Sequence, residues 1–146
     1  MAYSTPDDLA LRVGGSAVLV RLLDKDGDGV ADDALVSACI NQASSEVDAA
    51  VQVRHSLPLA STPMILTATE SSLAAYYAHQ FGTDGQGVPP NVRQMAEDAR
   101  AFLTDVAEGR RTLAVSVKPA TDLEAAQVDP DPDQTSVSRT SLKGFW

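Results

Sequence analysis

In three long stretches of the chain, mostly apolar side chains recur at intervals of three and four residues. This is the spacing of residues on one face of a helix. This spacing predicts long helices over about 33–54, 63–81 and 92–108. The residues that share these faces are Val36, Cys39, Ile40, Ala43, Val47, Ala50 and Val51; Leu66, Thr69, Leu73, Tyr76, Tyr77 and Gln80; and Val92, Met95, Ala96, Ala99, Phe102, Leu103 and Val106.

Proline, glycine and capping residues set the expected ends of these helices. The first helix is expected to end near Arg54, because Leu57 precedes a proline and therefore favours an extended backbone. Thr62 and Pro63 have the pattern of an N-cap followed by a first helical residue. Asn91 is the expected cap of the third helix, and Gly109 its expected stop.

Two shorter helices are predicted near the beginning of the chain. Thr5 is a good N-cap, Pro6 suits the first helical position, and Gly14 with Gly15 ends the segment. A second short helix is expected over 16–23. The sequence therefore predicts an all-α protein, a small helical bundle of about four to five helices over residues 1–111.

A different period appears at residues 112–117, where apolar and polar side chains alternate. Alternation of this kind predicts a short C-terminal strand. No second strand is predicted in the chain, and an isolated strand leaves its backbone donors and acceptors unpaired. We therefore expect this strand to pair with another chain.

An extended C-terminal arm is predicted over residues 118–146. Residues 118–134 combine three prolines with five acidic side chains, a composition that buries too little apolar surface to fold, and they are expected to act as a spacer. The tip that follows is apolar and basic. Beyond Val117 the chain can reach roughly 90 Å when extended. The residues expected to bind partners are Leu113, Val115, Val117, Val137, Arg139, Leu142, Lys143, Phe145 and Trp146.

The net charge of −9 limits the partners of this protein. It has the wrong sign for binding a phosphate backbone or an anionic membrane. An acidic surface can nevertheless line a passage through which DNA moves. No apolar run approaches the roughly 20 residues that span a bilayer, so no membrane segment is expected.

The segment from Asp24 to Asp32 matches the pattern of a calcium-binding loop. Asp24, Asp26, Asp28 and Asp32 stand at the first, third, fifth and ninth positions, Gly29 stands at the sixth, and the carbonyl of Val30 stands at the seventh. Carboxylate and carbonyl oxygens are the ligands that Ca²⁺ prefers.

Two interpretations of this loop remain open. The twelfth position holds Leu35 where a bidentate Glu is expected, so a bound ion needs Asp33, water or a neighbouring subunit to complete its shell. The other interpretation is an acidic turn whose last aspartate caps the next helix. Ca²⁺ is the one candidate cofactor.

The remaining reactive side chains do not form a catalytic pattern. His55 and His79 are far apart and are expected to be structural or exposed, and Cys39 lies on an apolar stripe where a buried thiol is usual. The glycines at 82–87 lack the Lys-Ser/Thr of a phosphate-binding loop. We expect no enzymatic activity.

Five collinear segments resemble the Mu-like phage head–tail connector family, whose members are also called head completion proteins. They are YSTPDDLALRVG, LLDKDGDGVADDALV, VDAAVQVRHSLPL, TPMILTATESSLAAYY and SVSRTSLKGF. The resemblance extends over essentially the whole chain. The acidic proline stretch before the end and Trp146 depart from the family pattern, which leaves the docking place of the arm open.

The resemblance implies a structural virion protein in the neck of a tailed phage, assembled in the bacterial cytoplasm. It implies a ring of about twelve copies below the portal protein and above stopper or tail-terminator proteins, with DNA passing through its channel. Two other classes of protein are alternatives: a calcium-dependent protein-interaction module of the dockerin kind, and a small enzyme or regulator. Dockerins use paired calcium loops, and this sequence has one.

Overall fold

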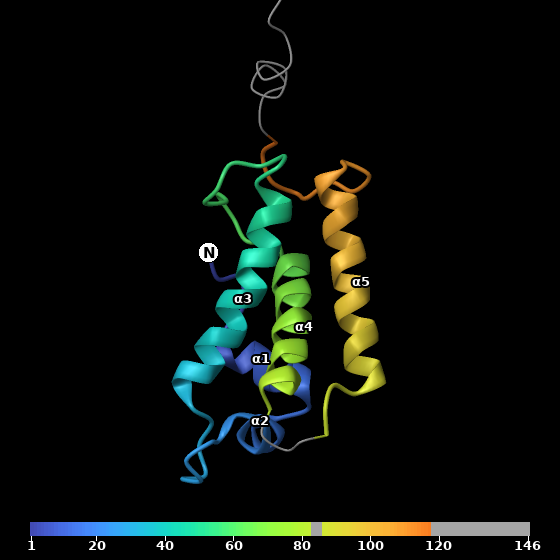
Figure 1. Cartoon of the computed structure of the whole chain (residues 1–146). Coiled ribbons are helices and arrows are strands. Elements are labelled where there is room, and N and C mark those ends of the chain that lie inside the picture. Colours follow the sequence, from blue (N-terminus) through green and yellow to red (C-terminus); the bar gives the residue numbers. More distant parts are fainter. Residues whose placement is uncertain (83–85, 118–146) are drawn as a thin grey trace, which may run out of the picture.

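The computed structural model describes residues 1–82 and 86–117, and these form five helices (Figure 1). The helices are α1 (Pro6–Val13), α2 (Ser16–Leu23), α3 (Asp33–Val51), α4 (Met64–Phe81) and α5 (Pro90–Ala107). The three long helices lie side by side, and α1 and α2 lie near one end of the bundle (Figure 1). The prediction of an all-α bundle of four to five helices is confirmed.

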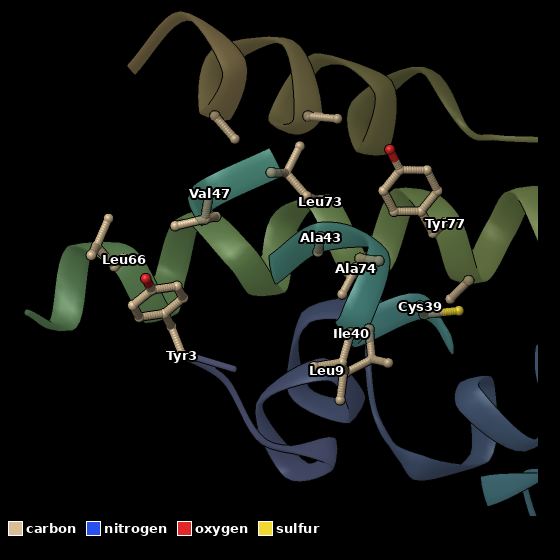
Figure 2. Packing of buried hydrophobic residues seen from close by; sticks show 14 of the residues in the cluster. Tyr3, Leu9, Cys39, Ile40, Ala43, Val47, Leu66, Leu73, Ala74 and Tyr77 are labelled. Atoms are coloured by element: carbon tan, nitrogen blue, oxygen red, sulfur yellow. The ribbon is translucent and has the colours of Figure 1, made fainter. Parts of the chain in front are cut away.

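Helix α4 is the centre of the bundle, because it contacts each of the other four helices. Many of its buried residues are small, among them Ser71, Ser72, Ala74, Ala75 and Ala78. Small side chains let neighbouring backbones approach closely. Large apolar residues from α1, α3 and α4 fill the remaining space in one continuous core (Figure 2).

The expected start of α1 is confirmed in detail. Thr5 is the N-cap, and its side chain accepts a hydrogen bond from the Asp8 amide while the Asp8 carboxylate accepts one from the Thr5 amide. This reciprocal arrangement satisfies two donors that the first helical turn leaves without partners. Gly14 then ends the helix with a φ of 108°, a left-handed conformation that glycine adopts without strain.

Three other helix ends differ from the predictions by one to three residues. Helix α4 begins at Met64, because Pro63 is extended with a ψ of 137° and serves as the N-cap. Pro89 caps α5 in the same way, so Asn91 lies inside the first turn instead of capping it. Helix α3 ends at Val51, three residues before the expected end. Tight turns continue after it, since the amide of His55 donates to the carbonyl of Val51.

The predicted strand at residues 112–117 is not formed in this structure. A strand needs a neighbouring strand to pair its backbone groups, and the described part of the chain offers none. The segment instead lies against its own domain. Leu113 is buried in the core, and the carbonyl of Ser116 lies 2.9 Å from Nδ1 of the buried His55.

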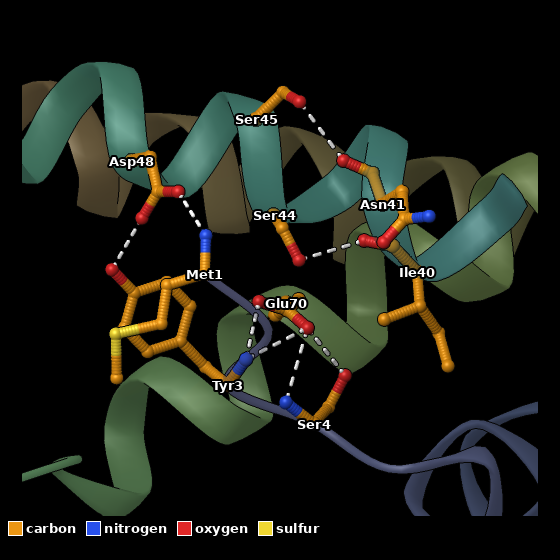
Figure 3. A network of polar contacts seen from close by, with 9 residues as sticks. All are labelled: Met1, Tyr3, Ser4, Ile40, Asn41, Ser44, Ser45, Asp48 and Glu70. Atoms are coloured by element: carbon orange, nitrogen blue, oxygen red, sulfur yellow. Dashed lines mark hydrogen bonds and ion pairs between the residues drawn. The ribbon is translucent and has the colours of Figure 1, made fainter. Parts of the chain in front are cut away.

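A buried carboxyl group ties the N-terminal segment to α4. Glu70 is fully buried, and its side chain accepts hydrogen bonds from the amides of Tyr3 and Ser4 and from the Ser4 hydroxyl, at 2.8–3.1 Å (Figure 3). The carbonyl of Tyr3 accepts a further bond from Thr67. Glu70 therefore provides the hydrogen bonds that an extended segment lacks when it is buried.

An arginine from the turn after α3 caps the end of α5. Arg54 donates to the carbonyls of Ala107 and Glu108, both at 3.1 Å. The chain then turns at Gly109, which has a φ of 77°. A Cβ at position 109 would clash with the Arg54 guanidinium group, so this turn favours glycine for its conformation, and a side chain there would displace Arg54.

We predict that Glu70→Ala lowers the free energy of unfolding by about 2–3 kcal/mol, because the buried donors of Tyr3 and Ser4 lose their acceptor. Urea denaturation followed by circular dichroism measures this loss. The control is Glu97→Ala, which removes an exposed carboxylate from α5 and is expected to change stability by less than about 0.5 kcal/mol. Equal stability of the two variants would contradict the anchoring role of Glu70.

We predict that Gly109→Ala destabilises the fold more than Gly87→Ala. Both glycines have a positive φ, so both variants carry a backbone cost of about 1–2 kcal/mol. Position 87 is open, whereas a side chain at 109 displaces Arg54 and adds about 1 kcal/mol for the lost cap. This excess should vanish in an Arg54→Ala background in a double-mutant cycle by urea denaturation. An excess that persists there would refute the contact.

Candidate cation loop and partner-binding surfaces

The loop between α2 and α3 brings three of the predicted calcium ligands together. Asp24, Asp26 and Asp28 each offer a carboxylate oxygen, and these oxygens lie within 4.8 Å of one another. The spacing of the sequence therefore corresponds to a real convergence of acidic groups. In Figure 1 this loop lies at the end of the bundle opposite to residues 112–117.

Backbone amides of the loop wrap around Asp24. Its two carboxylate oxygens accept hydrogen bonds from the amides of Gly27 at 2.7 Å and Gly29 at 3.0 Å. Both glycines have positive φ values, which allow the sharp turns that aim these amides inward. Asp26 and Asp28 each accept one bond from the amide two residues ahead.

The Asp32 carboxylate is not part of the group formed by the three other carboxylates. One of its oxygens instead accepts a hydrogen bond from the amide of Lys25 at 3.1 Å. Asp32 occupies the N-cap position of α3, yet its side chain makes no capping bond there. It closes the loop instead of capping the helix. Leu35 packs against the core, which explains an apolar residue at the twelfth position.

Hydrogen bonds and neighbouring charges in this loop shift the pKa values of Asp24 and Asp26 in opposite directions. Desolvation acts to raise the pKa of Asp24, but hydrogen bonds from the Gly29 and Gly27 amides outweigh it and lower the pKa. For Asp26, the hydrogen bond from the Asp28 amide acts to lower the pKa, but the neighbouring Asp24 carboxylate and the charges of Asp28 and Asp32 raise it overall. The loop thus carries like charge that a bound cation would neutralise.

The predicted partner-binding residues are only partly within the described chain. Val137, Arg139, Leu142, Lys143, Phe145 and Trp146 lie outside it. Of the other three, Leu113 is buried in the core of its own chain, which differs from its expected role at a partner. Val115 is partly buried, and Val117 is half exposed beside the loop containing Pro58 and Leu59.

Two adjoining grooves on the α1, α4 and α5 face were not predicted. The first lies mainly between α4 and α5 with a volume of about 510 Å³, and the second lies between α1 and α4 with a volume of about 470 Å³. They share Arg12, Ala68 and Met95. We call them together the apolar groove.

Exposed apolar side chains gather at the apolar groove. Leu11 is 79% exposed, Met64 is 86% exposed and Ile65 is 48% exposed, and all three line it. Phe102 of α5 forms part of its floor. The sequence contains a sign of this surface, because Met64 and Ile65 precede the predicted buried stripe of their helix. Only the packing of the described chain shows that these two side chains are exposed.

The two histidines and the cysteine lie in the interior of the fold. His55 and His79 are buried, and Cys39 is buried in the core, where desolvation raises the pKa of its thiol to about 11. Such a thiol is protonated at neutral pH and is a poor nucleophile. Both histidines, which were expected to be structural or exposed, are buried, and the expectation of a buried cysteine is confirmed.

A polar cluster joins α3, α4 and α5 on the side away from the N-terminal segment. Arg100 forms a two-point ion pair with Glu46 at 2.9 and 3.1 Å, and Tyr77 donates to the same carboxylate. Arg100 also lies over the ring of Tyr76, 5.0 Å from its centre. Desolvation acts to raise the pKa of Glu46, but Arg100 and Tyr77 lower it overall. This arrangement cross-links the bundle.

The fold and these surfaces define a small all-helical protein with an acidic loop at one end and an apolar groove along its side. None of the helices in the described chain is both long and apolar enough to cross a membrane. Residues 3–129 match the family described as Bacteriophage Mu, Gp36. The chain belongs to this phage protein family, so it is a phage structural or morphogenesis protein. No curated protein is similar enough to match it.

Proposed function

We propose that this protein is the head–tail connector of a tailed phage, an adaptor that forms a ring below the portal around the DNA channel. The observation that carries this proposal is the family match over residues 3–129. The expected ring has twelve copies, lies in the neck of the virion and is assembled in the bacterial cytoplasm. The portal protein is the expected partner on one side, and a stopper or tail-terminator protein is expected on the other.

The charge of the domain fits a ring through which DNA passes. Residues 1–117 carry fifteen acidic and eight basic side chains, an excess of seven negative charges. A surface of this sign repels the phosphate backbone and so lets DNA slide past without being held. A channel lined in this way requires no sequence-specific contact and no catalytic group.

The arrangement of the two ends fits an adaptor between two partners. The Asp24 loop and the segment 112–117 lie at opposite ends of the bundle (Figure 1). The arm continues from the second of these ends, and its tip carries Leu142, Phe145 and Trp146. Large aromatic and apolar side chains of this kind are typical anchors of protein interfaces.

We predict that purified protein mixed with purified portal gives twelve-fold rings stacked on the portal, visible by electron microscopy. Truncation after Gln134 should abolish these stacked rings while changing the melting temperature of the domain by little, because the tip contributes to contacts between chains and not to the core. The matched control is Asp131→Ala/Asp133→Ala, which alters the spacer and leaves the tip intact. Attachment by the truncated chain, or a melting temperature that falls in parallel, would refute this division of roles.

A second candidate function, calcium-dependent protein interaction, is favoured by the convergence of Asp24, Asp26 and Asp28. Three carboxylates with amides wrapped around the first of them suit a hard cation such as Ca²⁺. The absence of an acidic residue at the twelfth position implies weak binding. Such an ion would order the α2–α3 loop, either as a stabiliser within the connector or as a switch for a partner.

We predict that millimolar Ca²⁺ raises the melting temperature of the parent protein, since a ligand that binds only the folded state stabilises it. Asp26→Ala/Asp28→Ala should abolish this gain. The control Asp7→Ala/Glu97→Ala removes two exposed acidic charges elsewhere and should retain it. A parent protein whose melting temperature does not respond to Ca²⁺ would end the calcium hypothesis.

A further inference from the structure

From the geometry of the apolar groove we infer that it is the docking site for the C-terminal tip, residues 137–146, of a second copy of this chain. This inference deepens the proposed connector function and rests on it, because it names the contact that joins neighbouring copies of the ring. The contact runs from the tip of one copy to the groove of the next.

The groove has the properties of a site that receives large apolar side chains. Three of the exposed large apolar residues in the described chain, Leu11, Met64 and Ile65, line it. Met95 lies where its two halves meet. Methionine side chains are flexible and polarisable and adapt to the surfaces that they bind. Each half has a volume within the range of roughly 300–1,000 Å³ that is usual for binding pockets.

The tip has a matching pattern. Leu142, Phe145 and Trp146 stand at intervals of three and four residues, the spacing of anchors that an amphipathic segment presents to a groove. Two aromatic anchors of this size each bury about 150–250 Å² when they dock. The open groove on α1, α4 and α5 is the surface on which these anchors would lie.

The charges of the tip and of the domain are complementary. Arg139 and Lys143 are the charged side chains between positions 135 and 146, whereas residues 1–117 carry seven more acidic than basic side chains. The charged side chains that line the groove are Asp8, Asp98 and Asp105 together with Arg12 and Arg111, so the attraction comes from the net charge of the domain and not from the groove alone. The tip is therefore attracted to the domain by charge and held there by apolar contact.

The length of the spacer allows the tip to reach another copy. Residues 118–136 can extend over roughly 60 Å. A contact between two different surfaces of the same chain is heterologous, and repetition of such a contact closes a ring when the rotation between copies divides a full turn. Docking between copies can therefore build the ring that a connector needs. Docking within one copy joins no chains and cannot build it.

Trp146 is the single tryptophan of the chain and reports on the tip directly. In the full-length parent, its fluorescence emission should move to shorter wavelength as concentration rises and copies associate. The groove variant Leu11→Gln/Met64→Asp changes two exposed positions and should require at least about tenfold higher concentration for the same shift. The control Val53→Asp introduces a charge at an exposed apolar residue outside the groove and should behave as the parent.

A mixing experiment separates docking between copies from docking within one copy. The tip variant Phe145→Ser/Trp146→Ser has an intact groove and no tryptophan, and the groove variant has an intact tip. Mixing the two full-length variants should restore the emission shift, because the tip of one enters the groove of the other. Circular dichroism is used to check that both variants are folded. If the groove variant is unfolded, the single change Met64→Asp replaces it.

Three results would overturn the inference: no shift in the parent, a parent-like shift in the folded groove variant, or no recovery on mixing. The connector function is tested separately by rings on the portal. Rings formed by the groove variant would refute tip-to-groove docking and leave the connector function standing. Recovery on mixing without any ring on the portal would support the docking and refute the connector function.

Discussion

The burial of most of α4 between Thr69 and His79 is the constraint on which the rest of the structure depends. In this part the helix is surrounded by four others, so each buried polar group must find a partner inside the bundle. Thr69 and Ser72 return hydrogen bonds to carbonyls one turn earlier, and Glu70 binds the N-terminal segment. No buried polar side-chain atom within the described residues lacks a partner.

This central helix also determines which surfaces remain free. In the first turn of α4, Met64 and Ile65 are exposed. The apolar groove lies along this uncovered part. On another side, the Glu46 and Arg100 ion pair closes the bundle. The fold therefore leaves the apolar groove open, while the ion pair joins α3 to α5 within the chain.

The two ends of the bundle are held by different means. At one end the aspartate loop supports itself through hydrogen bonds between its carboxylates and its own amides. At the other, Arg54 caps α5 and His55 contacts the segment that leads into the arm. Residues 112–117 are thus held against the domain, and the tip can lie no farther from them than the extended length of the spacer.

The sequence by itself determined the five helices, the N-cap at Thr5 and the grouping of three aspartates, because each depends on residues close together along the chain. Family membership was also predictable, from segments spread over the whole sequence, and the match over residues 3–129 confirms it. The exact helix starts at Met64 and Pro90 were less predictable, since proline is accepted both as a cap and as a first residue.

Only the tertiary structure decided the roles that depend on distant neighbours. Leu113 belongs to the core of its own chain, although its alternating pattern indicated a strand for a partner. Glu70 has the sequence pattern of a surface residue, but the N-terminal segment supplies donors that bury it, and a side chain at position 109 would displace Arg54. The apolar groove exists because three helices meet there and leave Met64 and Ile65 uncovered. Periodicity reports the face that a helix buries, but packing alone decides which of its other residues stay exposed.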